Sequence, residues 1–262
     1  MRLKDEVAIV TGGGVGIGRA MALAFAREGA AVVIAAIPPL SDLENVVNEI
    51  KGKGGRATAI RTDITDEKQV QRMVAQTLNE YGQIDILVNN SGIPGATANV
   101  VDVTLDDWNK TLAVNLTGTM LCSREVLKSM IPRQSGSIIN IASMAAKSGF
   151  IMRSPYCVSK WGVVGFTLTL AAEVGIYNIR VNAISPGPTQ GPRIEAVFRA
   201  KAEAIGIPYQ EFYESNVAKM ALRRLVTPDE IAAAAVFFAS DESRGVTGEV
   251  LNVNAGCLLN IW

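Results

Sequence analysis

The sequence predicts a doubly wound α/β fold, with a seven-stranded parallel sheet covered by helices on both faces. Short runs rich in β-branched residues alternate with longer amphipathic runs, which is the order of elements in such folds. The strand-like runs are continuously apolar, as expected for strands that are buried on both faces. No low-complexity tract or internal repeat divides the 262 residues, so we expect a single domain over 1–262.

The predicted elements follow one another along the whole chain. The strand-like runs lie at 7–11, 31–36, 57–61, 84–89, 137–141, 179–184 and 250–253. Helical patterns lie between them at about 16–29, 41–52, 66–81, 104–131, 155–175 and 228–240. The segment 186–228 breaks this rhythm, because it contains no strand-like run and is rich in proline and aromatic residues. Long insertions in compact domains are usually functional, so the sequence predicts a substrate lid at about 188–226.

Composition excludes several kinds of partner. The 25 basic residues balance the 25 acidic ones, so neither nucleic acid nor an anionic membrane is expected to bind. The N-terminus lacks the apolar core of a signal peptide, and the uncharged run 161–172 is too short to span a bilayer. The three cysteines are widely spaced, which suggests neither a disulfide framework nor a metal site. We therefore expect a soluble cytoplasmic protein without a metal.

A glycine-rich stretch, TGGGVGIG at 11–18, follows the first predicted strand and opens the first predicted helix. The glycines at 12, 16 and 18 let the backbone approach a pyrophosphate, and the helix N-terminus offers free N–H groups. A tight turn without a ligand is the alternative, but the strand before it and the helix after it favour dinucleotide binding. No lysine followed by serine or threonine occurs here, which argues against a nucleoside-triphosphatase loop.

The end of the second predicted strand bears on the choice between NAD and NADP. An acidic residue about 20 residues after the glycine turn usually binds the ribose 2′-hydroxyl of NAD, but Ala36 stands there. No cation stands there to bind a 2′-phosphate either, although Arg19 lies just past the glycine turn. A missing cation weakens NADP binding more than a missing hydrogen bond weakens NAD binding. We therefore expect NAD, with NADP as the alternative.

The chain contains no histidine, so proton transfer near neutral pH requires other side chains. In YCVSK, residues 156–160, Tyr156 and Lys160 lie four apart and therefore on one helix face. An ammonium about 4 Å from a phenolate stabilises it by about 4 kcal/mol at an effective dielectric of about 20. An oxidised nicotinamide would add a second positive charge. The pair can thus replace a histidine, although the motif taken alone is more typical of ordinary helix residues, because this spacing occurs often by chance.

Further motifs occur in order with these two. They are NNSG at 89–92, AVNLTGT at 113–119, SIINIAS at 137–143 and NAISPGPTQ at 182–190. Over about residues 7–256 the six motifs together resemble those of the short-chain dehydrogenase/reductase family, in its short, single-domain branch. The resemblance implies a Rossmann-like fold and an NAD(P)-dependent oxidoreductase that interconverts a secondary alcohol and a ketone by hydride transfer.

The resemblance also implies roles for individual residues. Tyr156 would be the general acid and base, and Lys160 would assist it and bind the nicotinamide ribose. Ser143 would bind the substrate oxygen, and Asn115 would anchor a water molecule. Besides Tyr156 and Lys160, the implied cofactor contacts are Gly12, Val15, Gly16, Ile17, Gly18, Asp63, Ile64, Asn90, Gly92, Pro186, Gly187 and Thr189.

Two other functions stay open. A non-catalytic nucleotide-sensing protein could share the fold, but such proteins typically lose the tyrosine or the lysine. Enoyl-thioester reductases of the same superfamily space the tyrosine and lysine more widely. The predicted pocket wall is mostly apolar and aromatic, so we expect a medium-sized organic alcohol or ketone as substrate. That wall comprises Ile93, Pro94, Met144, Phe150, Met152, Phe198, Tyr209, Phe212 and Tyr213.

Two expectations concern the surface. The helical patterns 104–131 and 155–175 carry more apolar residues than one face can bury, and similar proteins pair these helices between subunits. A homotetramer is therefore expected. Arg153, three residues before Tyr156, has two interpretations: a solvated loop arginine, which is the commoner situation, or a guanidinium that binds an anionic group of the substrate.

Overall fold

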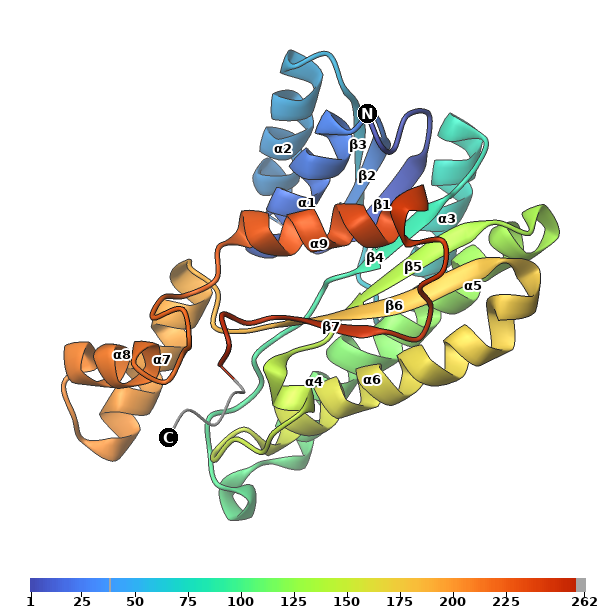
Figure 1. Ribbon diagram of the computed structural model, residues 1–262. Helices are drawn as coiled ribbons and strands as arrows, with labels where there is room; N and C mark the ends of the chain where they lie inside the picture. The colour runs from blue at the N-terminus through green and yellow to red at the C-terminus, as the bar shows by residue number, and fades with distance from the viewer. Residues whose placement is uncertain (38, 258–262) are drawn as a thin grey trace.

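Seven parallel strands form the centre of the protein. The computed structural model describes residues 1–37 and 39–257. Its strands are β1 (Val7–Thr11), β2 (Ala31–Ala36), β3 (Arg56–Arg61), β4 (Ile86–Asn89), β5 (Gly136–Ile141), β6 (Ile179–Pro186) and β7 (Val250–Val253). They pair in the order β3-β2-β1-β4-β5-β6-β7 (Figure 1). This is the Rossmann-like fold that the sequence predicts, and each predicted strand overlaps an observed one.

Helices cover both faces of the sheet (Figure 1). The helices on one face are α1 (Gly16–Arg27), α2 (Leu40–Gly52) and α9 (Pro228–Ala239), and those on the other are α3 (Glu67–Tyr81), α5 (Gly118–Arg133) and α6 (Ser154–Val174). Alternate residues of β1 enter different cores: Val10 packs with the first group and Ile9 with the second. Burial on both faces explains why the strands read as continuous apolar runs.

The predicted helix at 104–131 is present but interrupted. A π-helical turn, η2 (Ala113–Thr117), joins α4 (Leu105–Leu112) to α5. Asn115 lies in this turn and is fully buried. Single π turns inside α-helices are frequent at functional sites. The periodicity of apolar residues cannot show such a turn, because one added residue barely disturbs a helical pattern over this length.

Two helices occupy the segment that the sequence marks as irregular. α7 (Pro192–Ile205) and α8 (Tyr209–Val217) project to one side of the sheet (Figure 1). They pack through Phe198 and Phe212, whose ring centroids lie 5.3 Å apart. A bridge between Thr189 and Val226 joins the two ends of the segment. Phe198 belongs to the core on the α1, α2 and α9 face of the sheet, and Phe212 packs against that core, so this core continues into the segment. The role of the segment as a lid stays a prediction.

The helix α6 is long and apolar enough to cross a membrane by length and composition, when its final 3₁₀ turn is included (Ser154–Tyr177). The uncharged run on which the sequence argument rested is only part of this helix. One side of α6 packs against the sheet through Leu170 and Val174, and it buries Lys160. A core helix of an α/β domain has the same composition as a membrane span, so this property carries no membrane assignment.

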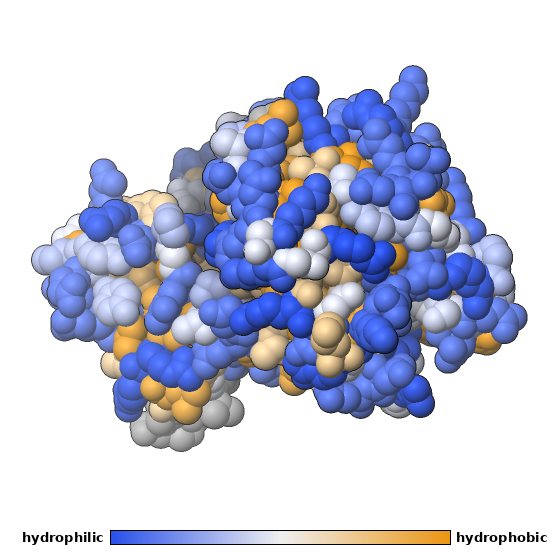
Figure 2. All heavy atoms as spheres, turned by 90° about the horizontal axis from the view of Figure 1, so that it is seen from above, coloured by the Kyte–Doolittle hydropathy of each residue, from blue (hydrophilic) through white to orange (hydrophobic). Residues whose placement is uncertain are grey.

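The surface is mostly hydrophilic when the molecule is seen from above (Figure 2). On this face hydrophobic residues gather chiefly on the side where α7 and α8 project (Figure 2). Acidic and basic residues also pair with each other on the surface, as in Arg2–Glu28 and Arg224–Glu230. This mixed surface agrees with the balanced charge of the sequence.

An acidic pair, half-buried Glu6 before β1 and buried Asp85 before β4, gives the stability of the protein a pH dependence. Burial and the adjacent Asp85 carboxylate raise the pKa of Glu6 to about 7, and Asp85 itself pairs with Arg133 at 2.5 Å. The folded protein therefore keeps a proton that the unfolded chain releases above its ordinary pKa of 4.5. The stability from this proton is present below pH 4.5 and is lost as the pH rises through about 7.

We expect the substitution Glu6→Gln to stabilise the protein above pH 7. Allowing for the partial exposure of Glu6, the gain in the free energy of unfolding should be about 1–2 kcal/mol at pH 8 and should shrink toward zero as the pH falls to 5. Urea unfolding at both pH values measures it, with the exposed Glu203→Gln as control. An equal gain at both pH values would show that Glu6 is not protonated in the folded state.

Candidate active site

The glycine turn shapes one end of the site. Gly12 and Gly16 have φ angles of +64° and +54°, which favour glycine. A Cβ on Gly18 would lie 2.1 Å from the carbonyl oxygen of Gly12, so only glycine fits where α1 crosses the end of β1. Val15, the residue before α1, provides no side-chain cap. The first N–H groups of the helix therefore stay available to an anionic ligand.

A large cavity opens from this turn along the carboxyl ends of the strands. Its volume is about 1600 Å³, which exceeds the roughly 300–1,000 Å³ of most small-molecule sites and suits a dinucleotide together with a substrate. All the predicted cofactor contacts line it, as do Ser143, Tyr156 and Lys160. Asn115 is the one predicted site residue that does not, because it lies fully buried behind the wall.

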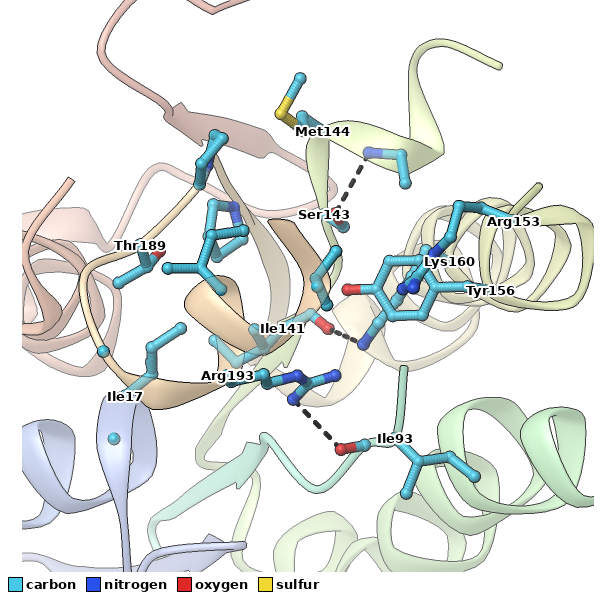
Figure 3. Close-up of a pocket in the computed structure, with 18 of the residues that line it drawn as sticks. Ile17, Ile93, Ile141, Ser143, Met144, Arg153, Tyr156, Lys160, Thr189 and Arg193 are labelled. Atoms are coloured by element: carbon cyan, nitrogen blue, oxygen red, sulfur yellow. Dashed lines mark hydrogen bonds between the residues drawn. The ribbon is translucent and has the colours of Figure 1, made fainter. Parts of the chain in front are cut away.

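Tyr156 and Ser143 face the same part of the cavity, from α6 and from the end of β5. The hydroxyl end of Tyr156 points to the side of the cavity that carries Ser143 and Thr189 (Figure 3). Ser143 precedes a short 3₁₀ turn, η3 (Met144–Ala146), and its Oγ accepts a hydrogen bond of 3.1 Å from the N–H of Ala145. Its hydroxyl proton is therefore free to bind another acceptor.

Lys160 lies beneath Tyr156 and is only 4% exposed. Its Nζ lies 5.9 Å from the centroid of the Tyr156 ring and donates a hydrogen bond of 2.7 Å to the carbonyl oxygen of Ile141 (Figure 3). Burial, and then the positive charge of Arg193, lower the pKa of Lys160 to about 7. A negative charge placed nearby would favour the ammonium form, so Lys160 is poised to respond to a phenolate or an anionic ligand.

Asn115 connects the chain before α4 to α6. Its Oδ1 accepts a hydrogen bond of 2.8 Å from the N–H of Ile93. Its Nδ2 donates to the carbonyl oxygen of Ile93 and to the Oγ of Ser159, at 3.0 Å each. Ser159 in turn donates to the carbonyl oxygen of Tyr156 at 2.7 Å. The Asn115 amide thus positions the first turns of α6, and the sequence analysis did not single out Ser159.

The end of the cavity that lies away from Tyr156 is formed at the carboxyl ends of β2, β3 and β4, beside the glycine turn. Asn90 donates through Nδ2 to the carbonyl oxygens of Thr11 and Gly12, at 2.9 and 3.1 Å, so it fixes the glycine turn. Asp63 accepts from the N–H and the hydroxyl of Thr65 at 2.9 and 2.7 Å. Ala36 and Ile37 line the wall at the end of β2.

Two residues discussed from the sequence lie outside the cavity wall. Arg19 forms an ion pair with Glu49 on α2 and does not line the cavity. Asn89 donates to Asn140 on β5 and to Ser123 on α5, at 2.8 and 2.9 Å. Asn89 therefore ties neighbouring elements together.

The predicted pocket wall needs one correction. Six of its nine residues line the cavity, whereas Pro94, Tyr209 and Tyr213 do not. Tyr213 instead packs against Phe198, with ring centroids 6.4 Å apart, and Tyr209 and Tyr213 line a separate small hollow between α7 and α8. The sequence places these tyrosines in the irregular segment 186–228, but it does not show which side of α8 faces the cavity.

Three cations that follow β6 line the cavity wall and were not anticipated from the sequence. Arg193 and Lys201 on α7 and Lys219 after α8 line the cavity. Arg193 donates a hydrogen bond of 3.2 Å to the carbonyl oxygen of Gly92, close to Lys160 (Figure 3). No motif marks these residues, and only the path of the chain after β6 brings them to the site.

A glycine cradle for a dinucleotide that leads to a serine, a tyrosine and a buried lysine defines the class of nicotinamide-dependent oxidoreductases. A family model described as enoyl-(acyl carrier protein) reductase matches residues 13–257. The 3-oxoacyl-[acyl-carrier-protein] reductase FabG of Thermotoga maritima is 36% identical over 259 residues, which cover 99% of this chain and 100% of that protein.

Solved structures agree with these sequence matches. The crystal structure of NAD⁺-bound xylitol dehydrogenase superposes with a TM-score of 0.94 and 32% identity, covering 98% of this chain and 100% of that one. The structure of an actinorhodin polyketide ketoreductase with NADPH gives a TM-score of 0.92 and 32% identity, with 96% and 97% covered. The chain belongs to the short-chain dehydrogenase/reductase family of NAD(P)-dependent oxidoreductases.

Proposed function

We propose that this protein interconverts a secondary alcohol and a ketone. The observation that carries the proposal is the position of Ser143, Tyr156 and Lys160 at the far end of the cavity that begins at the glycine turn. When bound, a nicotinamide cofactor supplies or accepts the hydride. Tyr156 gives the proton to the ketone oxygen or takes it from the alcohol, and the Ser143 hydroxyl holds that oxygen by a hydrogen bond.

Lys160 and Asn115 support this proton transfer. The ammonium of Lys160 stabilises negative charge on Tyr156 and binds the nicotinamide ribose. Asn115, whose side chain already holds Ile93 and Ser159, anchors a water molecule that links Lys160 to solvent. The predicted cofactor contacts, from Gly12 to Thr189, would hold the rest of the dinucleotide along the cavity.

NAD is the proposed cofactor, and NADP is the alternative. Of the described residues that line the cavity at the end of β2, Ala36 and Ile37 carry no charge. Arg19, the nearby cation, is engaged with Glu49. A 2′-phosphate carries nearly two negative charges and needs a cation, so this wall favours NAD. Both cofactors occur among similar structures, with NAD⁺ in one and NADPH in another.

One assay tests the reaction and the cofactor together. We expect members of a panel of secondary alcohols, with and without an acidic group, to reduce NAD, with a kcat/KM higher for NAD than for NADP, as followed by nicotinamide absorbance. A higher kcat/KM for NADP would refute the cofactor preference. Turnover of enoyl thioesters but of no ketone would favour an enoyl reductase, which is the description of the matching family model. Cofactor binding without any turnover would favour a nucleotide-sensing protein.

We also propose a cytoplasmic homotetramer. Val158, Trp161 and Leu168 lie along the outer side of α6 with between 45% and 52% of their surface exposed, so this helix presents an apolar stripe. A second copy of the chain covering this stripe would bury it symmetrically. Light scattering at micromolar concentration is expected to give the mass of four chains, and a monomer would refute the assembly.

A further inference from the structure

Arg153 is a buried cation for which the described residues supply no anion. It is 7% exposed, lines the cavity and precedes α6. Its guanidinium carbon lies 4.9 Å from the centroid of the Tyr156 ring, and Nη1 donates a long hydrogen bond of 3.3 Å to the Oγ1 of Thr97 (Figure 3). Within residues 1–37 and 39–257, none of the ion pairs within 4.0 Å includes Arg153. The interpretation as a solvated loop arginine is therefore wrong.

Other cations gather around the same part of the cavity. Arg193 and Lys201, both from α7, line it. Burial and the charge of Arg193 lower the pKa of Arg153, and burial and the charge of Arg153 lower the pKa of Lys201. Asp63, beyond β3 at the cofactor end, is the only acidic residue among the described lining residues. The substrate end is thus positive, although the whole chain has no net charge.

A cluster of this kind is costly unless an anion joins it. Burying a guanidinium beside other cations raises the free energy of the folded protein, because solvation is lost and like charges repel. A guanidinium has five N–H donors in a planar fork, and only one bond to a protein acceptor is formed here. The two oxygens of a carboxylate match that fork and would be held by two parallel hydrogen bonds.

The position of Arg153 in the cavity also indicates that the anion comes from the substrate and not from the cofactor. The pyrophosphate site lies at the N-terminus of α1, whereas Arg153 lies against Tyr156 at the catalytic end (Figure 3). Lys201 comes from α7 on the other side of the cavity and also lies over Phe150, with Nζ 5.7 Å from the ring centroid. An anion between Arg153 and Lys201 would sit among apolar walls and would draw α7 toward α6.

We propose that the substrate carries a carboxylate, which Arg153 binds through its guanidinium fork and Lys201 from the facing helix assists. The proposal rests on the dehydrogenase function above, since it describes the substrate of that site. Arg153 thereby selects acids over neutral alcohols and ketones, and it orients the reacting carbon toward Tyr156. The reaction chemistry itself stays with Tyr156, Lys160 and Ser143.

Direct binding tests the anion site without requiring turnover. Benzoate, which has no group to oxidise or reduce, should bind to the NAD-loaded protein at least roughly tenfold more tightly than benzamide in calorimetric titrations. Arg153→Gln should weaken benzoate binding roughly tenfold to a hundredfold and leave benzamide binding unchanged. Arg199→Gln removes the same charge from the outer side of α7, where Arg199 lies over Tyr209, and should change neither.

Kinetics then link the site to the reaction. The protein should reduce 3- or 4-acetylbenzoate with a KM well below that of the corresponding methyl ester, and Arg153→Gln should remove this difference by raising the KM of the acid. If Arg153→Gln fails to fold, Lys201→Gln, in a less buried position, should shrink the same difference severalfold. Reduction of the esters without any preference for the acids would overturn the carboxylate site and leave the dehydrogenase function intact.

The remaining outcomes are equally decisive. Arg153-dependent binding of benzoate without reduction of any ketone would keep the anion site and remove the proposed reaction. Tighter binding of inorganic phosphate than of benzoate, lost in Arg153→Gln, would replace the carboxylate by a phosphoester and so overturn the proposal. Equal binding of benzoate and benzamide in all variants would overturn the anion site and show that Arg153 only packs against the Tyr156 ring.

Discussion

The substitution Tyr156→Phe should lower kcat for alcohol oxidation and ketone reduction by at least about 100-fold, the lower end of what a general acid or base contributes. Phenylalanine keeps the ring that packs against Arg153 at 4.9 Å, so the wall of the cavity should survive. What is lost is the hydroxyl that we propose exchanges a proton with the substrate oxygen. The affinity for NAD, measured by titration calorimetry, should change little.

A matched variant distinguishes loss of this hydroxyl from loss of any tyrosine hydroxyl. Tyr209 lies on α8, packs against Tyr213 with ring centroids 6.2 Å apart and does not line the main cavity. Tyr209→Phe should keep kcat within about twofold of the unsubstituted protein, a difference of less than about 0.5 kcal/mol. Near-normal turnover by Tyr156→Phe would remove Tyr156 from the mechanism.

The substitution Gly18→Ala should abolish measurable cofactor binding or weaken it at least about tenfold. The new Cβ would lie 2.1 Å from the Gly12 oxygen and 2.5 Å from Nδ2 of Asn90. Neither atom can move away without a loss of stability, because Asn90 holds the turn by hydrogen bonds to Thr11 and Gly12. Displacing α1 from β1 to relieve the clash should also lower the free energy of unfolding by about 1–3 kcal/mol.

Titration with NAD and urea unfolding measure both effects. Gly52→Ala is the control, because a Cβ on Gly52 at the end of α2 meets nothing within 4 Å. It should leave NAD affinity unchanged and stability unchanged or higher by up to about 1 kcal/mol, since alanine favours helix more than glycine does. If Gly18→Ala binds NAD as tightly as this control, the glycine turn is not the cofactor cradle.

Features that depend on short stretches of chain were predictable from the sequence. The five inner strands, β1, β2, β4, β5 and β6, read as apolar runs because they are buried on both faces, whereas the edge strands β3 and β7 are partly exposed. Tyr156 and Lys160 share a face because four residues make about one helical turn, and both line the cavity. Gly12, Gly16 and Gly18 mark the turn after β1 because other residues resist its positive φ angles or its close contacts.

Features that depend on contacts between distant segments were decided only by the tertiary structure. Two interpretations of Arg153 were open from the sequence. Its burial against Tyr156 depends on how the loop before α6 meets Thr97, 56 residues away. Asn115 was expected at the site, but its fully buried position in a π turn follows from bonds to Ile93 and Ser159.

The path of the chain after β6 likewise decided the charge of the cavity. Arg193 and Lys201 lie in a segment whose sequence shows only that it is irregular, and α7 carries both to the cavity wall. Local pattern therefore determined the fold and the shared helix face of Tyr156 and Lys160, because backbone geometry repeats over a few residues. The electrostatics of the substrate end depended on long-range packing, because charges separated by tens of residues interact only after the chain has folded.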